Sequence, residues 1–356
     1  MITNQKKDFL IGFHDPIVIT GASGFIGRRL VQSLLDLGFR NLRCFVRPWS
    51  DVSRVPVLSG AAQDAGHVQV VRGNLLAPED CAVAADAAVV FHLAAARGEK
   101  SFADAFMNSV VTTRNLLEAC LGNRGLRRFV NVSSFTVYTN KRNPRGRPLA
   151  ETSPVETHPE LRGDPYCFAK VKQEQIVTEY GKQHGIPYVI VRPGHVYGAG
   201  NEAITGRVGI STFGMFLHLG GSNTIPLTYV ENCADAIALA GVTKGVAGEV
   251  FNVVDDDLPS SRQFLRQYKR SVGPFHSLWV PPAVSYALCY LWERYAAWSE
   301  GQLPPLFNRR RWYANWNKAR YSNEKLKSLV GWAPKVPTAE GLMRYFDSCS
   351  ELRRHA

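Results

Sequence analysis

The chain has 356 residues, of which 45% are hydrophobic and 20% charged, so it can build a full-sized core in one large domain or two closely joined ones. Its seven cysteines are scattered and form no metal-ligand pattern with each other or with histidine, which argues against a metal site and favours reduced thiols in a cytoplasmic protein. The formal net charge of +12 favours anionic partners, such as nucleotide phosphates or an acidic membrane surface, although a basic surface also simply keeps a protein soluble.

Short apolar runs alternate with helical segments from residue 16 onward. The first run, Pro16–Thr20, meets a cluster of glycines, and apolar residues then recur at helical spacing from Phe25 to Leu37. Further strands are expected at 42–46, 68–71, 88–92, 129–132 and 188–191, with helices at 102–121 and 165–184. Because the strands are rich in valine and apolar throughout, the pattern predicts an α/β fold, a Rossmann-type doubly wound parallel sheet with helices on both faces.

The pattern changes after Gly194, where glycine-rich loops begin. A short strand at 227–230, a helix at 232–242 and a strand at 250–254 are expected to return to the sheet. The remaining residues must form a smaller lobe. We therefore predict a dinucleotide-binding domain of residues 13–194 plus 226–258, and an interleaved C-terminal substrate lobe of residues 195–225 plus 259–346.

A glycine-rich loop joins the first strand to the first helix. It reads Thr-Gly-Ala-Ser-Gly-Phe-Ile-Gly and places Gly21, Gly24 and Gly27 where bare backbone N–H groups and the helix N-terminus can face a pyrophosphate. Glycines are common in any turn, but the preceding strand and the following helix are the context that a dinucleotide site requires. The loop therefore predicts dinucleotide binding.

The second strand ends in Phe-Val-Arg-Pro and offers no acidic residue to accept hydrogen bonds from a ribose 2'-hydroxyl. Arg47, together with Arg28, instead suits a 2'-phosphate. This favours NADP(H) as the cofactor, with NAD(H) as the other choice, because Arg47 can also be a solvated strand end.

Tyr166 and Lys170 stand four residues apart, on one face of the helix that their neighbours predict. A free tyrosine has a pKa of about 10, and a nearby ammonium group favours the tyrosinate that acid/base chemistry near neutral pH requires. The same Tyr-x-x-x-Lys spacing recurs at 321–325, but without a serine motif near it in the sequence. The context favours the first pair.

Ser134 directly follows the fifth strand, on the carboxyl edge of the sheet where ligands of doubly wound folds bind. Its hydroxyl can hold a substrate oxygen beside Tyr166. Taken alone, Ser133 and Ser134 would merely end a strand, and the tyrosine would merely pack in the core. A dinucleotide sensor without catalysis would need neither Tyr166 nor Lys170, so the three residues together favour an enzyme.

Together with three further motifs, these features resemble the extended short-chain dehydrogenase/reductase family, over residues 16–346. The motifs are Phe91–Ala95 after the fourth strand, Asn108–Leu117 in the next helix, and Arg192–Gly198 after the sixth strand. The family includes nucleotide-sugar epimerases and the 3β-hydroxysteroid dehydrogenase and dihydroflavonol reductase branches. The resemblance implies an NAD(P)-dependent enzyme, in which Tyr166 exchanges a proton with an alcohol or ketone while hydride moves to or from nicotinamide.

The resemblance also assigns roles to individual residues. The catalytic set is Ser134, Tyr166 and Lys170, with Asn108 supporting them from its helix. The expected cofactor contacts are Gly21, Ser23, Gly24, Phe25, Ile26, Gly27, Arg47, Asn74, Leu75, Leu93, Ala94, Ala95, Ser133, Tyr166, Lys170, Pro193 and Val196. Asn74 replaces the family's usual aspartate at the adenine, which keeps an acceptor and loses a charge. Substrate contacts are expected from Ser134, His195 and Arg207, although a loop or pocket-wall role is favoured for His195.

Two departures from the family pattern narrow the reaction. Phe135 and Thr136 follow Ser134 where a dehydratase carries an Asp-Glu pair, which argues against sugar dehydration and against decarboxylation that uses the same glutamate. Pro226 stands near where nucleotide-sugar enzymes commonly carry an arginine for the phosphate. This segment and those at 279–288, 302–306 and 321–334 are similar to the reductase and hydroxysteroid dehydrogenase branches. An apolar or aromatic alcohol or ketone is therefore the favoured substrate.

Arg207 and the run Arg309–Arg311 keep a nucleotide-sugar epimerase as the alternative, because either can hold a diphosphate. The family further implies a homodimer formed through the helices near 102–121 and 165–184. A nucleic-acid partner is not expected, since the basic residues are spread along the chain without a recognised motif.

Residues 278–292 form an uncharged run with two prolines, too short to span a bilayer. The run predicts a helix of the smaller lobe that packs on the pocket. A peripheral membrane contact, helped by the neighbouring arginines, is expected only if the aromatic face of this helix is exposed. The N-terminus has no long apolar run of the kind a signal peptide needs.

Overall fold

A seven-stranded parallel sheet forms the centre of the molecule in the computed structural model, which describes residues 8–53, 55–95, 101–141, 147–212, 214–300, 302–303 and 307–355. The strand order is β11-β6-β5-β4-β1-β2-β3, and every neighbouring pair is parallel. The strands are β1 (Ile17–Thr20), β2 (Leu42–Val46), β3 (Val68–Arg72), β4 (Val89–His92), β5 (Arg128–Val132), β6 (Tyr188–Pro193) and β11 (Val250–Val253). The predicted doubly wound fold is confirmed.

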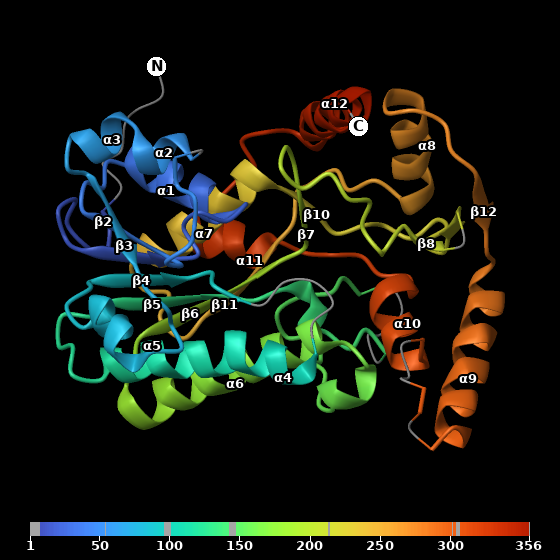
Figure 1. The fold of residues 1–356 in the computed structure, drawn as a ribbon, viewed down its shortest axis with the longest axis horizontal. Helices are drawn as coiled ribbons and strands as arrows, with labels where there is room; N and C mark the ends of the chain where they lie inside the picture. The colour runs from blue at the N-terminus through green and yellow to red at the C-terminus, as the bar shows by residue number, and fades with distance from the viewer. Residues whose placement is uncertain are drawn as a thin grey trace.

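Helices cover both faces of this sheet (Figure 1). On one face, α1 (Gly27–Asp36) packs beside α7 (Val230–Val242), and on the other α5 (Thr112–Cys120) packs beside α6 (Pro165–His184). The alternation along β1 explains the layering, since Ile17 and Ile19 face the core under α1 and α7 while Val18 faces the core under α5 and α6. Residues buried on both sides account for the valine-rich strands. The shorter helical segments are α2 (Pro56–Ser59), α3 (Ala61–Asp64), η1 (Pro78–Ala84), η3 (Phe135–Val137), η4 (Pro159–Arg162) and α11 (Glu324–Val330).

The helix predicted at 102–121 contains a π-helical segment. It begins as α4 (Phe102–Ala105), widens into η2 (Phe106–Val111) and continues as α5. π-Turns of this kind insert a residue into a helix and are frequent at functional sites. The inserted turn carries Asn108.

One expected strand of the sheet lies elsewhere. β10 (Leu227–Tyr229) pairs with β7 (His195–Tyr197) in a separate two-stranded sheet, so the prediction that residues 227–230 return to the main sheet was wrong. The edge of β6 is taken by β11, and Gly194 N donates to Val253 O at 2.9 Å. A Cβ on Gly194 would lie 2.2 Å from Pro226 O, so the chain passes too close there for any side chain. β10 therefore pairs only with the residues that follow Gly194, which form β7.

The described residues of the smaller lobe form a three-stranded sheet and, besides the short α11, four helices. The strands are β8 (Gly209–Thr212), β9 (Met215–His218) and β12 (Ser277–Trp279), and the helices are α8 (Ser261–Ser271), α9 (Pro282–Trp298), α10 (Arg309–Trp316) and α12 (Thr338–His355). The helix predicted within 278–292 is present as α9. It packs on α10 rather than on the pocket. The Trp312 ring of α10 packs against small buried side chains of α9, and its indole N–H donates to Ser285 Oγ at 2.9 Å. Among the described helices, none has the length and apolarity to cross a membrane.

Candidate active site

A cavity of about 610 Å³ lies at the carboxyl ends of the parallel strands, where ligands of doubly wound folds bind. It brings together segments that are far apart in the sequence. Of the predicted cofactor and catalytic residues, the cavity is lined by Gly21, Ser23, Gly24, Ile26, Gly27, Arg47, Asn74, Leu75, Leu93, Ala94, Ala95, Asn108, Ser133, Ser134, Tyr166, Lys170, Pro193 and Val196. Phe25, His195 and Arg207 lie outside this lining.

The glycine loop leaves one end of the cavity free of side chains. Gly21 has a φ of +71°, and a Cβ there would lie 3.1 Å from Ala94 N. A Cβ on Gly27 would lie 2.1 Å from Gly21 O, so only glycine lets the loop pack onto the start of α1. No described side chain caps α1, and Gly27 at its start lines the cavity, so the positive end of the helix dipole faces the ligand site. This arrangement fits a pyrophosphate.

The far end of the cavity is formed by the residues after β2 and β3. Arg47 is exposed there, and Trp49 and Ser50 beside it also line the cavity. Asn74 is held by local hydrogen bonds, since its backbone N–H donates to Asp80 and its Oδ1 accepts from Leu76 N at 3.1 Å. No acidic residue of the loop after β2 lines the cavity, as the sequence predicts. Arg28 is directed elsewhere, because its Nη2 donates to Ala199 O at 3.3 Å.

Tyr166 and Lys170 lie in the first turns of α6. Pro165 starts this helix, and the Asp164 side chain caps it by accepting from Cys167 N at 3.1 Å. Lys170 is only 4% exposed, and its Nζ donates to Val132 O at 2.7 Å. The same Nζ lies 5.9 Å from the centroid of the Tyr166 ring. The lysine is thus fixed by the end of β5 with its charge close to the tyrosine.

Ser134 lies two residues beyond the end of β5 and is the N-cap of the single turn η3. Its Oγ accepts from Thr136 N at 3.2 Å, which fixes the side chain at the cavity edge. Ser133 also lines the cavity, and its buried Oγ has no hydrogen-bond partner among the described residues. A buried hydroxyl without a partner is costly, so Ser133 fits a polar ligand at this point.

A buried hydrogen-bond network connects β1 and β4 with α5 and with α6, the helix that carries Tyr166 and Lys170. His92 at the end of β4 bonds with Thr20 Oγ1 through Nδ1 and with Thr113 Oγ1 through Nε2, each at 2.9 Å. Gln173 Nε2 donates to Thr113 Oγ1 at 2.8 Å, and Thr113 donates to Ser109 O at 2.6 Å. Thr113 must then accept from His92, so His92 carries its proton on Nε2 and is neutral. Burial, with the Lys170 charge, lowers the pKa of His92 to about 3.

Asn108 lies on the π-turn and lines the cavity from the α6 side. Its Nδ2 donates to Asp104 O at 3.0 Å, and the side chain is exposed. Ser109, the next residue, accepts from Gln173 of α6 through its carbonyl at 3.2 Å. The π-turn therefore ties Asn108 to the helix that carries Tyr166.

Arg207 and His195 lie near each other, outside the lining of this cavity. Arg207 Nη1 donates to Ala314 O at 2.9 Å, and no described carboxylate pairs with its guanidinium. Burial lowers the pKa of Arg207, and Arg162 adds to the effect. Burial and the Arg207 charge lower the pKa of His195 to about 4, so its ring is neutral. The neighbouring arginines differ, since Arg309 pairs with Glu293 and Arg310 with Glu156.

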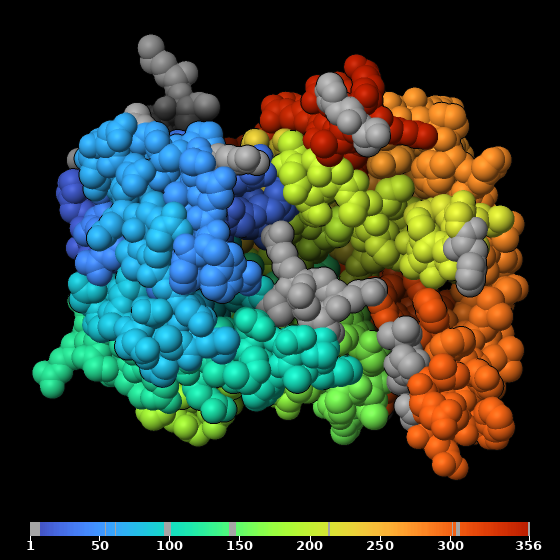
Figure 2. All heavy atoms as spheres, in the orientation of Figure 1, coloured from blue at the N-terminus to red at the C-terminus, as the bar shows by residue number. Residues whose placement is uncertain are grey.

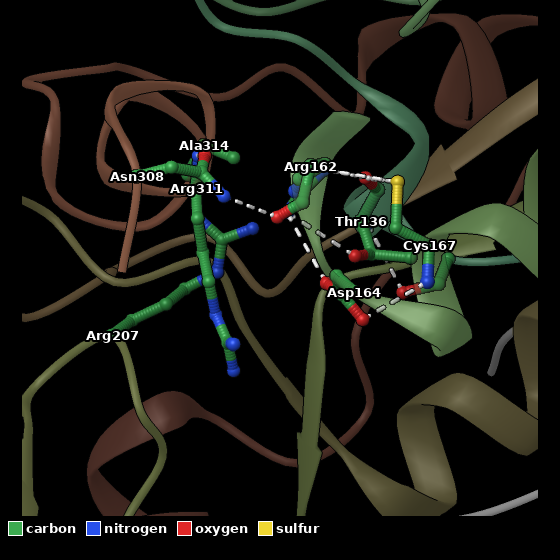
Figure 3. Close-up of polar contacts among 9 residues, drawn as sticks. Thr136, Arg162, Asp164, Cys167, Arg207, Asn308, Arg311 and Ala314 are labelled. Atoms are coloured by element: carbon green, nitrogen blue, oxygen red, sulfur yellow. Dashed lines mark hydrogen bonds and ion pairs between the residues drawn. The ribbon is translucent and has the colours of Figure 1, made fainter. Parts of the chain in front are cut away.

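The serine turn is joined to the smaller lobe by Arg162, as Figure 3 shows. Arg162 is buried and donates to Thr136 O at 2.5 Å and to Cys167 Sγ at 3.2 Å. Asn308, the cap of α10, donates to Arg162 O at 2.8 Å. The position of Ser134 thus depends on contacts with both α6 and α10.

The second Tyr-x-x-x-Lys pair is not built in the same way. Tyr321 precedes α11 rather than lying in it, and its ring stacks on Phe135 with centroids 5.6 Å apart. Lys325 pairs with Glu249 at 2.5 Å. Tyr166 and Lys170 share one helix and one cavity, whereas this pair does not.

Several lining residues were not predicted from the sequence. They include Trp49, Gly73, Leu76, Asp104 and Thr112. Gly73 and Leu76 follow β3 closely, so the rule that ligands bind beyond the carboxyl ends of parallel strands could have found them. Trp49 is 74% exposed, and no motif in the sequence sets it apart from the other tryptophans.

Residues 17–253 match the model of the NAD dependent epimerase/dehydratase family. The chain belongs to the NAD-dependent epimerase/dehydratase family. This confirms the resemblance to the extended short-chain dehydrogenase/reductases, which rested on the glycine loop and the Tyr-x-x-x-Lys pair. Enzymes of this family use a nicotinamide dinucleotide, and the glycine loop and the Ser133 hydroxyl fit one.

The similar proteins within the family differ in their reactions. The chain is 26% identical to 3beta-hydroxysteroid-dehydrogenase/decarboxylase isoform 1 of Arabidopsis thaliana, over 94% of this chain and 80% of that protein. It is 27% identical to the UDP-glucose 4-epimerase of Mycolicibacterium smegmatis, over 92% of this chain and 96% of that protein. The crystal structure of UDP-glucuronic acid 4-epimerase from Bacillus cereus in complex with NAD has the same fold, with a TM-score of 0.69 and 21% identity over 95% of this chain and 99% of that chain.

Proposed function

We propose that this protein is an NAD(P)-dependent oxidoreductase that transfers hydride between nicotinamide and a secondary alcohol or ketone, with Tyr166 as the acid/base. The observation that carries the proposal is that Ser134, Tyr166 and Lys170 line the same cavity as the glycine loop. A dinucleotide sensor would not need the buried lysine, whose burial is costly without a function for its charge.

Each catalytic residue has a distinct part in the proposed reaction. In the oxidation direction, Ser134 Oγ holds the substrate hydroxyl, and the Tyr166 phenolate takes its proton as the carbon–hydrogen bond breaks. The bound dinucleotide supplies the acceptor for the hydride. Lys170, held by Val132 O, keeps a positive charge near Tyr166 and so favours the phenolate. In the reverse direction, Tyr166 protonates the ketone oxygen.

NADP(H) is the proposed cofactor, with NAD(H) as the second choice. Arg47 follows β2, which lies far from β5 in the strand order, and no acidic side chain of the loop after β2 lines the cavity, where it would repel a 2'-phosphate. The exposed Arg47 guanidinium has the geometry to hold a phosphate through two hydrogen bonds.

The proposed substrate is an apolar or aromatic alcohol or ketone. Pro226 lacks the phosphate-binding group that a nucleotide-sugar enzyme would place in this segment, and its carbonyl is engaged with His195 N at 2.6 Å. The similarity to a 3beta-hydroxysteroid-dehydrogenase/decarboxylase supports the same choice.

One observation favours a second function, a nucleotide-sugar epimerase. Arg207 is a buried cation without a described carboxylate partner, and such a group suits an anionic substrate. The similarity to a UDP-glucose 4-epimerase supports this alternative. In that reaction, hydride would return to the same molecule after a transient ketone.

A net change in the oxidation state of the cofactor distinguishes the two functions. We would follow nicotinamide absorbance with purified protein, NADP(H) or NAD(H), and a panel of apolar ketones, aromatic alcohols and nucleotide-sugars. Net turnover of a ketone or alcohol is expected. Isomerisation of a sugar without net change in the cofactor would establish the epimerase instead.

A further inference from the structure

Helix α9 carries an apolar stripe that faces solvent. Val284, Leu288, Leu291, Tyr295 and Trp298 are spaced alternately four and three residues apart, which puts them on one side of the helix. These five side chains are between 48% and 76% exposed. Figure 2 shows α9, in orange, as a ridge at the edge of the molecule. We call these five residues the α9 stripe.

The opposite face of α9 makes the contacts that attach this helix to the smaller lobe. Ser285, Cys289 and Ala296 are buried, and Cys289 packs in a cluster with Trp312 of α10. Glu293 is paired with Arg309, with Nε and Oε2 2.9 Å apart. The stripe is therefore not needed to attach the helix to the lobe. A contiguous exposed apolar surface of this size on a folded protein marks an interaction site.

The exposed charges of α8, β12 and α9 are mostly basic. Arg294 is exposed on α9 itself, and Arg262, Arg266 and Arg270 are exposed on α8. β12 connects the two helices along the same edge of the molecule (Figure 1) and adds exposed Leu278 and Trp279. Arg262 lies over the Trp279 ring at 5.8 Å. Of the acidic groups, Glu293 is neutralised by Arg309, and Glu300 follows the helix.

We propose that the α9 stripe docks onto an anionic lipid bilayer, with the helix lying in the interface and the arginines of α8 and α9 against the headgroups. An apolar helix face containing Trp and Tyr, bordered by cations, is the pattern of interfacial helices. A second copy of the chain is a poorer occupant, because a two-fold contact would bring the same arginines against each other. No described helix can span the bilayer, so the contact is peripheral.

The test compares two variants that carry the same added charge. Leu288→Asp/Leu291→Asp places two carboxylates in the stripe. Leu329→Asp/Met343→Asp places two carboxylates at exposed apolar residues elsewhere on the surface. Full-length protein is sedimented with phosphatidylcholine vesicles, with or without phosphatidylserine, and thermal melting verifies that each variant is folded.

The wild type and the control variant are expected to sediment with the phosphatidylserine vesicles and far less with phosphatidylcholine alone. The stripe variant is expected to lose at least about tenfold in partitioning, because two apolar contacts are replaced by charges. Equal sedimentation of the stripe and control variants would overturn the proposal. So would a wild type that stays in the supernatant, and light scattering would then show whether the stripe instead holds a second copy.

Discussion

The chemistry proposed here depends on single side chains, and Tyr166 is the first to test. Replacing Tyr166 with Phe keeps the ring and removes the proton donor, so we expect kcat to fall by about 10²- to 10⁴-fold with little change in KM. Tyr180→Phe is the matched control, because Tyr180 lies on the same helix and its hydroxyl bonds to Glu118 on the surface. Steady-state kinetics on the best substrate of the panel provides the measurement. Equal rates for both variants would remove Tyr166 from the mechanism.

Arg47 governs the choice of cofactor in this account. Arg47→Asp should raise KM for NADP(H) by at least about tenfold, because a carboxylate repels the 2'-phosphate, and should leave KM for NAD(H) equal or lower. The comparison is internal to one variant, so a general loss of activity cannot imitate it. Parallel changes in both KM values would mean that Arg47 is a solvated strand end.

At the scale of elements, the neutral His92 joins β1, β4, α5 and the Thr113 network. Its pKa of about 3 lies below the ordinary value of 6.5, so between these two values the unfolded chain binds a proton that the folded protein does not. This contribution to stability is present above pH 6.5 and is lost as the pH falls. From pH 7 to pH 5 it amounts to about 2 kcal/mol.

His92→Gln should therefore flatten the pH dependence of stability between pH 7 and pH 5. Denaturant unfolding of both proteins at each pH measures it. His195, whose pKa is also lowered, contributes in the same direction and leaves some dependence in the variant. Identical pH slopes for wild type and variant would show that His92 does not titrate as described.

The elements predicted correctly from the sequence are those whose apolar residues follow one regular spacing. The valine-rich strands and the helix at 165–184 were found, and with them the carboxyl edge that carries Ser134 and the residues around it. A π-turn adds one residue to a helix and hardly changes the apolar spacing, so η2 was not predicted. Strand pairing is a tertiary property, so nothing in residues 227–230 could show that they pair with β7. The same holds for which face of α9 is covered.

For the whole molecule, α10 connects the buried face of α9 to the catalytic region. Trp312 of this helix packs on α9, Ala314 O accepts from Arg207, and its cap Asn308 contacts Arg162 beside the serine turn. If both proposals hold, an apolar substrate is taken up at the membrane surface. Phosphatidylserine vesicles should then lower KM for apolar ketones while kcat stays unchanged, and high salt should cancel the effect. If vesicles still lowered KM in the Leu288→Asp/Leu291→Asp variant, the effect would not depend on the α9 stripe.

The most direct test of the central claim is isotope transfer. Protein is incubated with NADPH carrying deuterium at nicotinamide C4, separately in each of the two stereochemical positions, and with the ketone that turns over best. Mass spectrometry of the alcohol is expected to find one deuterium on the carbinol carbon from one of the two labelled cofactors, and none with Tyr166→Phe over the same time. An alcohol free of deuterium with both cofactors, or label transfer unchanged in Tyr166→Phe, would contradict the account.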